Sequence, residues 1–192
     1  MIRVAILASG NGSNAENLIQ NCPSSLVEFP VIITDNAKAG VLERAQRLEV
    51  ATQVFSRQDF QEGGVVLDFL HRERIDGILL AGFLSRIPQC LVAEYPQKIL
   101  NIHPALLPRF GGRGRYGRFV HEAVLASGEA VSGITIHYVD AQYDHGAPLC
   151  QATCPVYPDR DTPDDLAERI HHLEYLYYPI AVQQWLRQIF GL

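Results

Sequence analysis

The sequence has few cysteines and no long apolar run, and each shortage argues against a class of protein. Four cysteines in 192 residues are too few and too scattered for a disulfide framework, so we expect free thiols and a cytoplasmic location. Cys150 and Cys154 share one face of a predicted strand, but structural zinc usually needs four ligands, and we expect no metal. The apolar runs stay far below the roughly 18 residues of a membrane span, so we expect neither a membrane span nor a signal peptide.

Basic residues are also few. The 16 Lys and Arg residues are outnumbered by 21 Asp and Glu, which leaves a net charge of -5 and argues against a broad basic surface for nucleic acid. We therefore expect small-molecule substrates. With 47% hydrophobic residues and no internal repeat, residues 1–192 are expected to form a single domain with a sizeable core, as a monomer or a homodimer.

Apolar runs alternate with helix-like stretches, which predicts an α/β fold with a Rossmann-like, mostly parallel sheet flanked by helices. The expected strands are residues 2–8, 29–34, 52–55, 77–81 and 98–102, and the expected helices are 15–20, 40–48, 65–74 and 88–94. After residue 103 the pattern predicts a helix at 120–126 and mixed or antiparallel strands at 133–139 and 148–156. A closing helix should begin after the N-cap Thr162, stop near Pro179 and resume over residues 181–190.

A glycine-rich turn follows the first strand. Residues 10–15, Gly-Asn-Gly-Ser-Asn-Ala, fit the Gly-x-Gly-x-x-Gly/Ala spacing that presents backbone N–H groups at a helix N-terminus to a phosphate. Ser13 and Glu16 also match a capping box. Asp35 lies about 20 residues beyond the turn, where a dinucleotide enzyme places the acid that binds a ribose. An NAD-binding oxidoreductase therefore stays open on these residues.

Asn101 and His103 lie on one face of the strand that ends at Pro104, because strand side chains alternate with period two. The carboxyl ends of parallel strands are where α/β folds place their chemistry. An isolated strand histidine is usually structural, but this position and the asparagine two residues earlier favour a catalytic pair.

Four segments together resemble the folate-dependent formyltransferases, and among them the phosphoribosylglycinamide formyltransferases, over almost the whole chain. They are residues 10–14 (GNGSN), 80–83 (LAGF), 101–108 (NIHPALLP) and 143–146 (YDHG). The resemblance implies the formyltransferase fold and transfer of the formyl group of 10-formyltetrahydrofolate to the amine of glycinamide ribonucleotide, in purine (IMP) biosynthesis. It also implies no metal, a nucleotide-binding half in residues 1–100 and a catalytic, folate-binding half in residues 101–192.

The family's catalytic trio corresponds to Asn101, His103 and Asp144. Attack of the amine on the formyl carbon creates a tetrahedral oxyanion that needs fixed hydrogen-bond donors, which the asparagine and histidine can supply. We expect Asp144 to raise the pKa of His103, favour the imidazolium and help to move the amine proton through water. His137 is expected to be a structural histidine beside the site.

The resemblance also implies two substrate sites. The ribonucleotide site consists of Gly12, Ser13, Asn14, His171 and Glu174, of which the last two are spaced i, i+3 on one helix face. The folate site consists of Leu84, Ser85, Arg86, Ile87, Asn101, Asp140, Ala141, Gln142 and Tyr143.

Two features depart from the family pattern. Ser85 stands where family members often have arginine. The loop from Arg109 to Arg118 is longer and more basic than usual, and it either adds cations over the phosphate or the folate glutamate tail, contacts a partner, or is simply solvated. A non-catalytic nucleotide-binding module remains the third alternative.

Overall fold

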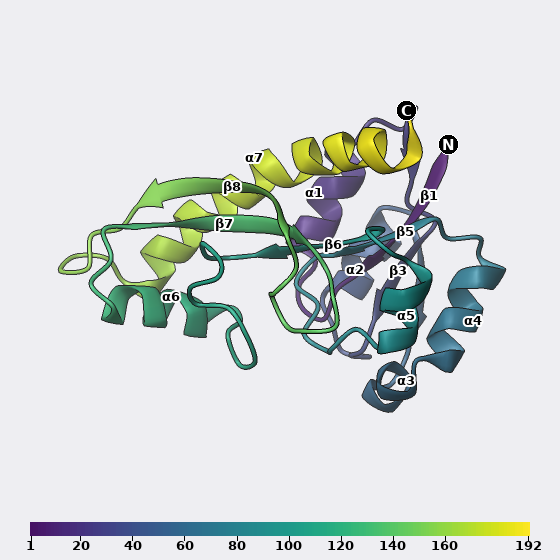
Figure 1. Cartoon of the computed structure of the whole chain (residues 1–192), viewed down its shortest axis with the longest axis horizontal. Coiled ribbons are helices and arrows are strands. Elements are labelled where there is room, and N and C mark those ends of the chain that lie inside the picture. The colour runs from purple at the N-terminus through teal and green to yellow at the C-terminus, as the bar shows by residue number, and fades with distance from the viewer.

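The computed structural model describes residues 1–192 and contains one mixed sheet with helices on both faces (Figure 1). The strands run in the order β4-β3-β1-β5-β6-β7-β8, and the short β2 also pairs with β1. They are β1 (Ile2–Leu7), β2 (Val27–Glu28), β3 (Val31–Thr34), β4 (Ala51–Val54), β5 (Gly77–Leu80), β6 (Ile99–His103), β7 (Val131–Tyr138) and β8 (Pro148–Pro155). Pairing is parallel from β4 to β6 and antiparallel from β6 to β8. The predicted α/β class is therefore confirmed.

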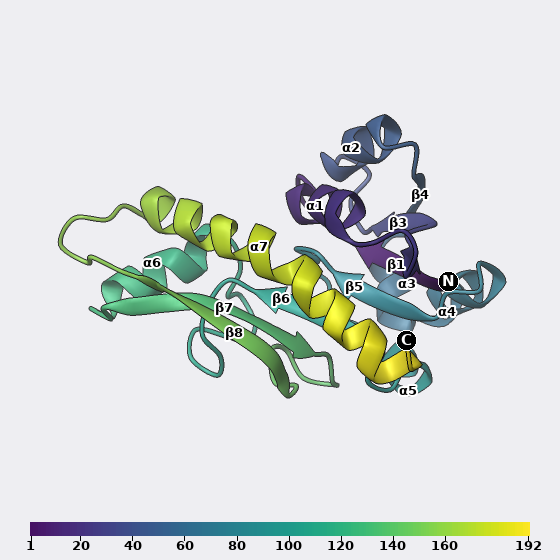
Figure 2. The same ribbon diagram turned by 90° about the horizontal axis from the view of Figure 1, so that it is seen from above.

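The sheet separates two apolar cores because its central strands are buried on both faces. In β1, Val4 and Ile6 face the larger core, whereas Ala5 and Leu7 face the smaller one. Helices α1 (Ser13–Asn21), α2 (Val41–Arg47), α6 (Arg118–Ala126) and α7 (Pro163–Phe190) contribute to the larger core. Helices α3 (Arg57–Glu62), α4 (Gly64–Arg72) and α5 (Gln89–Glu94) contribute to the smaller one. Figure 2 shows α7 crossing the sheet obliquely from the β7–β8 hairpin toward the N-terminal strand.

Helix α7 is continuous through Pro179, so the predicted break there is wrong. Its N-terminus is as predicted, with a capping box between Thr162 and Asp165. A proline inside a helix has no N–H to donate to the carbonyl four residues earlier, which in this helix belongs to Tyr175. The Asn17 side chain of α1 donates to that carbonyl instead, at 3.1 Å. A neighbouring helix thus satisfies the group that the proline leaves free.

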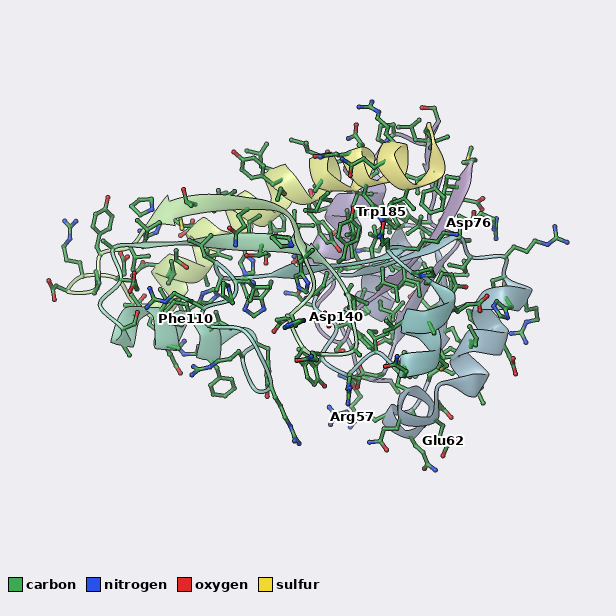
Figure 3. The ribbon with its side chains drawn as sticks, viewed as in Figure 1. Arg57, Glu62, Asp76, Phe110, Asp140 and Trp185 are labelled. Atoms are coloured by element: carbon green, nitrogen blue, oxygen red, sulfur yellow. The ribbon has the colours of Figure 1, made fainter.

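Two aromatic side chains hold α7 on the sheet. Tyr178 donates its hydroxyl hydrogen to the Leu80 carbonyl at 3.0 Å, and Trp185 donates Nε1–H to the Gln97 carbonyl at 2.9 Å. Figure 3 shows Trp185 between the helix and the strands. A Cβ at Gly77 would lie 2.6 Å from the Trp185 ring, so the indole needs glycine at that strand position.

The sequence patterns missed two elements. Helix α3, which a capping box between Ser56 and Asp59 opens, lies in a segment where no helix was expected. The two-residue β2 was missed as well, because so short a strand carries no periodicity. No helix of the chain combines the length and apolar character needed to cross a bilayer.

Candidate active site

An open cavity of about 970 Å³ lies beside the carboxyl ends of the parallel strands β1, β5 and β6. Its walls come from the glycine-rich turn, the segment after β5, the end of β6, the loop before α6, and α7. The predicted site residues that line it are Gly12, Ser13, Asn14, Leu84, Ser85, Arg86, Ile87, Asn101, His103, Tyr143, Asp144, His171 and Glu174. Segments that are far apart in the sequence thus meet around one cavity.

The rest of the predicted folate segment lies outside this cavity. Gln142 lines a neighbouring hollow of about 360 Å³, together with Tyr143 and Asp144. Asp140 accepts hydrogen bonds from the Gln142 amide and from His145, and Figure 3 shows its position in the connection between β7 and β8. The Ala141 carbonyl accepts a 2.5 Å hydrogen bond from Arg86. That bond joins the two segments that were expected to hold folate.

Strand β6 presents Asn101 and His103 on the face of the sheet that also carries Ile99, in the smaller core. Pairing with β7 sets Asn101 opposite His137 and His103 opposite Thr135. His103 is buried because the chain folds back over the strand end. Asn101 and His103 therefore lie on the same face of β6, as the strand periodicity predicted.

Asp144 joins this pair from the connection between β7 and β8. Its Oδ1 accepts from Asn101 Nδ2 at 3.3 Å, and its Oδ2 lies 3.5 Å from His103 Nδ1. The Gly112 amide donates to the same Oδ2 at 3.0 Å. Asp144 has a φ of 51°, a left-handed conformation that aspartate tolerates better than most residues.

The ring nitrogens of His103 have different partners. Nε2 lies 3.0 Å from the Phe110 carbonyl, which can only accept, so Nε2 carries a proton. Nδ1 faces Asp144 and is the atom that can gain or lose one. Burial lowers the pKa of His103 below its ordinary value of 6.5, although Asp144 acts to raise it. The expected upward effect of Asp144 on the pKa of His103 is therefore present, but in the free protein the loss of hydration outweighs it.

The pKa of Asp144 is lowered, and Asp144 is therefore ionised at neutral pH. Burial on its own acts to raise it, but the His137 and His103 rings and the Gly112 amide together outweigh that effect. His137 is held by the Tyr138 carbonyl, which lies 2.8 Å from its Nδ1, so its Nε2 is free to accept from Asn101 at 3.0 Å. His137 thus orients the asparagine amide.

At the other end of the cavity, the glycine-rich turn opens α1. Gly12 is the N-cap with a φ of 78°, and a Cβ there would lie 2.3 Å from Val41, so this position needs glycine. The predicted capping box of Ser13 and Glu16 is wrong. Ser13 lies within the helix and makes no capping bond, and Glu16 pairs with Arg44 of α2. Ser13 instead lines the cavity.

Helix α7 contributes a polar group next to this turn. Glu174 is buried, and its Oε2 accepts from Asn14 Nδ2 at 2.9 Å and lies 3.0 Å from His171 Nδ1. The hydrogen bond to Glu174 raises the pKa of His171. His121 also lines the cavity, is buried, and has no hydrogen-bond partner at Nδ1. Sequence reasoning missed His121, whose only signal was a histidine on the apolar face of a predicted helix.

Asp35 does not line the cavity, which removes the ribose-binding role that the NAD alternative gave it. Its side chain is 1% exposed, and both of its oxygens accept 2.5 Å hydrogen bonds, from Ser9 and from Ser85. A carboxylate so enclosed cannot reach the hydroxyls of a dinucleotide. The NAD-binding alternative loses the residue on which it depended.

The basic loop before α6 forms part of the cavity wall. Arg113, Arg115 and Tyr116 are exposed and line the cavity, opposite the segment after β5. Figure 3 labels Phe110, near the start of the loop, and Arg57 of α3. Arg57 is a further cavity residue that the sequence patterns did not indicate.

Residues 2–182 match the family model described as formyl transferase. The chain belongs to the formyl transferase family. The chain is 40% identical over 183 residues to the chloroplastic phosphoribosylglycinamide formyltransferase of Arabidopsis thaliana. This alignment covers 92% of the chain and 62% of that relative. It is 31% identical to the phosphoribosylglycinamide formyltransferase of Haemophilus influenzae, over 95% of the chain and 86% of that protein.

Solved structures agree with these relatives. The phosphoribosylglycinamide formyltransferase of Anaplasma phagocytophilum superposes with a TM-score of 0.87 at 34% identity, covering 97% of this chain and 87% of that one. The corresponding enzyme of Brucella melitensis gives 0.85 at 38% identity, with 96% and 95% covered. The mostly parallel sheet with antiparallel strands at its end is therefore the fold of this formyl transferase family.

Proposed function

We propose that the protein is a phosphoribosylglycinamide formyltransferase, which transfers the formyl group of 10-formyltetrahydrofolate to the amine of glycinamide ribonucleotide. One observation carries the proposal: Asn101, His103 and Asp144 meet at the end of β6, inside a cavity whose other end is a glycine-rich helix N-terminus. A single cavity thus offers a phosphate site and a set of groups suited to acyl transfer.

The ribonucleotide is proposed to bind between the glycine-rich turn and α7. Backbone N–H groups at the start of α1 and the Ser13 hydroxyl suit a phosphate, because the first amides of a helix have no intrahelical acceptor. Glu174, held by Asn14 and His171, suits the ribose hydroxyls. The glycyl amine would then extend toward His103.

The folate donor is proposed to bind along residues 84–87 and Tyr143, with Asp140, Ala141 and Gln142 supporting that wall. The Arg86 bond to the Ala141 carbonyl holds these two segments together. Such a site brings the formyl group to the Asn101 amide while the rest of the folate follows the cavity to its mouth.

In the proposed reaction, the amine nitrogen bonds to the formyl carbon and the carbonyl electron pair moves to oxygen, which gives a tetrahedral oxyanion. Asn101 donates a hydrogen bond to this oxygen, and His103, which takes up a proton at Nδ1 in the substrate complex, stabilises the same charge. Asp144 stabilises the imidazolium and, through water, accepts the proton that the amine loses. Collapse breaks the bond to the folate N10, which takes up, through water, the proton that Asp144 accepted, and releases formylglycinamide ribonucleotide and tetrahydrofolate.

The two alternatives differ from this proposal in what the protein consumes. An oxidoreductase needs the buried Asp35 at the cofactor and leaves the Asn101 cluster without a purpose. A non-catalytic binding module would bind the ribonucleotide and leave the folate unchanged. We propose small-molecule substrates with no metal, a cytoplasmic location, and a monomeric or homodimeric state, although the Arabidopsis relative is chloroplastic by name.

The test follows folate absorbance with 10-formyltetrahydrofolate, with and without glycinamide ribonucleotide. Turnover that needs both substrates supports the proposal. Consumption of the donor without ribonucleotide would indicate a hydrolase, and absence of turnover in folded protein that binds ribonucleotide would indicate a binding module.

A further inference from the structure

Asp35 joins three segments that meet at the ends of strands β1, β3 and β5. Its Oδ1 accepts from the Ser9 hydroxyl and its Oδ2 from the Ser85 hydroxyl, both at 2.5 Å. Ser9 in turn accepts from the Leu84 amide at 2.9 Å and donates its own amide to the Gly82 carbonyl at 3.1 Å. Asp35 and Ser9 thus hold the segment after β5 at Gly82, Leu84 and Ser85.

The segment after β5 forms part of the cavity wall, whereas Asp35, whose carboxylate holds that segment, does not line the cavity. Leu84 and Ser85 line the cavity, whereas neither Asp35 nor Ser9 does. The Asp35 side chain is 1% exposed, and a buried carboxylate is costly unless its oxygens are satisfied. The two serines meet that need and thereby fix the conformation of residues 82–85.

The same carboxylate lies close to a cation at the cavity wall. Arg57 Nε is 3.9 Å from Asp35 Oδ2, with the Arg57 side chain 77% exposed. Figure 3 shows Arg57 extending from α3 at the edge of the protein. Asp35 therefore stands between the wall segment on one side and an exposed guanidinium on the other.

We propose that Asp35 is a positioning residue for the folate donor: it sets the backbone of residues 84–87 through Ser9 and Ser85 without touching the donor. The inference rests on the proposed function, since it takes these residues as the donor site. The Ser85 hydroxyl, at the position where family members often have arginine, donates to Asp35, so this side chain serves the donor site by fixing the backbone that binds the donor. No hydrogen bond of this network reaches Gly12, Asn14 or Glu174 at the ribonucleotide end of the cavity.

The test compares Asp35→Ala, Asp35→Asn and Ser85→Ala in steady-state kinetics. Asp35→Ala should raise the KM for 10-formyltetrahydrofolate about tenfold, because it removes two charge-assisted hydrogen bonds, and should leave the KM for ribonucleotide within about twofold. Asp35→Asn should recover most of this loss, since an amide can accept from one serine and donate to the other. The double variant Asp35→Ala with Ser85→Ala should be no worse than Asp35→Ala alone.

Asp76→Ala is the matched control. Asp76 accepts from the Arg3 amide at 2.9 Å, and Figure 3 shows it beside the N-terminal strand, far from Arg57. Loss of this carboxylate should lower Tm without changing either KM. If Asp35→Ala likewise lowers Tm and changes neither KM, or raises both KM values equally, Asp35 is merely structural and the proposal is overturned. Additive effects in the double variant would overturn the indirect role of Ser85.

Isothermal titration with tetrahydrofolate, the reaction product, separates this proposal from the proposed function. If wild type binds tetrahydrofolate but transfers no formyl group, the proposed function fails, and a roughly tenfold weaker Kd in Asp35→Ala would still support the positioning role. An unchanged Kd in folded Asp35→Ala, or no binding by wild type, would overturn it.

Discussion

His103 Nδ1 faces Asp144 Oδ2 across 3.5 Å, although one residue ends a central strand and the other lies in the connection between β7 and β8. They meet because β7 runs antiparallel to β6 and the chain after β7 folds back across the exposed end of β6. The carboxylate is held independently by the Gly112 amide and by Asn101. It is therefore in place before any substrate binds, as electrostatic preorganisation requires.

Asp144→Asn removes the charge of this pair and preserves its size. We expect kcat to fall about 100-fold or more, because general acid–base groups typically contribute that much, with a much smaller change in either KM. Circular dichroism and Tm should show that the variant folds. An unchanged rate in folded Asp144→Asn would remove Asp144 from the mechanism.

Glu174→Gln tests the ribonucleotide end of the cavity. The amide can still hydrogen-bond to Asn14, but it loses the carboxylate whose hydrogen bond and charge raise the pKa of His171 and which would accept from ribose hydroxyls. The KM for ribonucleotide should rise about tenfold, with the KM for the folate donor unchanged. Glu168, which is exposed on the same helix, is the matched control, and Glu168→Gln should alter neither KM. A rise confined to the donor KM would contradict the assignment.

The buried histidines predict how stability depends on pH. Burial lowers the pKa of both His103 and His121 below 6.5, so between their folded pKa and 6.5 the unfolded chain binds more protons. The free energy of unfolding should therefore fall as pH drops below about 6.5. His121→Gln removes one such group. Urea unfolding at pH 7 and pH 5 should show wild type losing more stability than His121→Gln, whereas an equal or smaller loss would contradict the account.

The basic loop offers a kinetic prediction. Arg113 and Arg115 are exposed on the cavity wall, so replacing both with alanine should raise the KM of one anionic substrate about three- to tenfold and leave kcat nearly unchanged. Arg72→Ala, an exposed position on α4 away from the cavity, serves as control. If neither KM changes in the double variant, the loop is a solvated segment without a role in binding.

The central parallel strands could be predicted because they are buried on both faces and read as nearly continuous apolar runs. Strands β1, β3 and β5 lie within the expected residue ranges. The sequence of α7 alone could not show that the helix continues through Pro179. The side chain that donates a hydrogen bond to the Tyr175 carbonyl belongs to α1. The capping box predicted at Ser13 is absent for a similar reason, because Glu16 forms an ion pair with Arg44 of another helix.

The candidate site, like the fold, could be predicted only in part. Asn101 and His103 could be paired from strand periodicity, whereas Asp144 came only from the family motif, because no local pattern connects it to β6. Asp35 fitted a familiar spacing, yet the two serines that enclose it come from different strand ends. The family motif indicated the carboxylate that acts to raise the pKa of His103, but it could not indicate the burial that lowers this pKa further than Asp144 raises it.

The central claim is that His103 and its neighbours catalyse formyl transfer to the ribonucleotide. The most direct test measures this transfer from 10-formyltetrahydrofolate with wild type and His103→Ala side by side, after tetrahydrofolate titration has shown that both bind folate. We predict turnover that depends on ribonucleotide in wild type and at least about a 100-fold loss in the variant. Equal rates in the two proteins, or no transfer by folded, folate-binding wild type, would contradict the account.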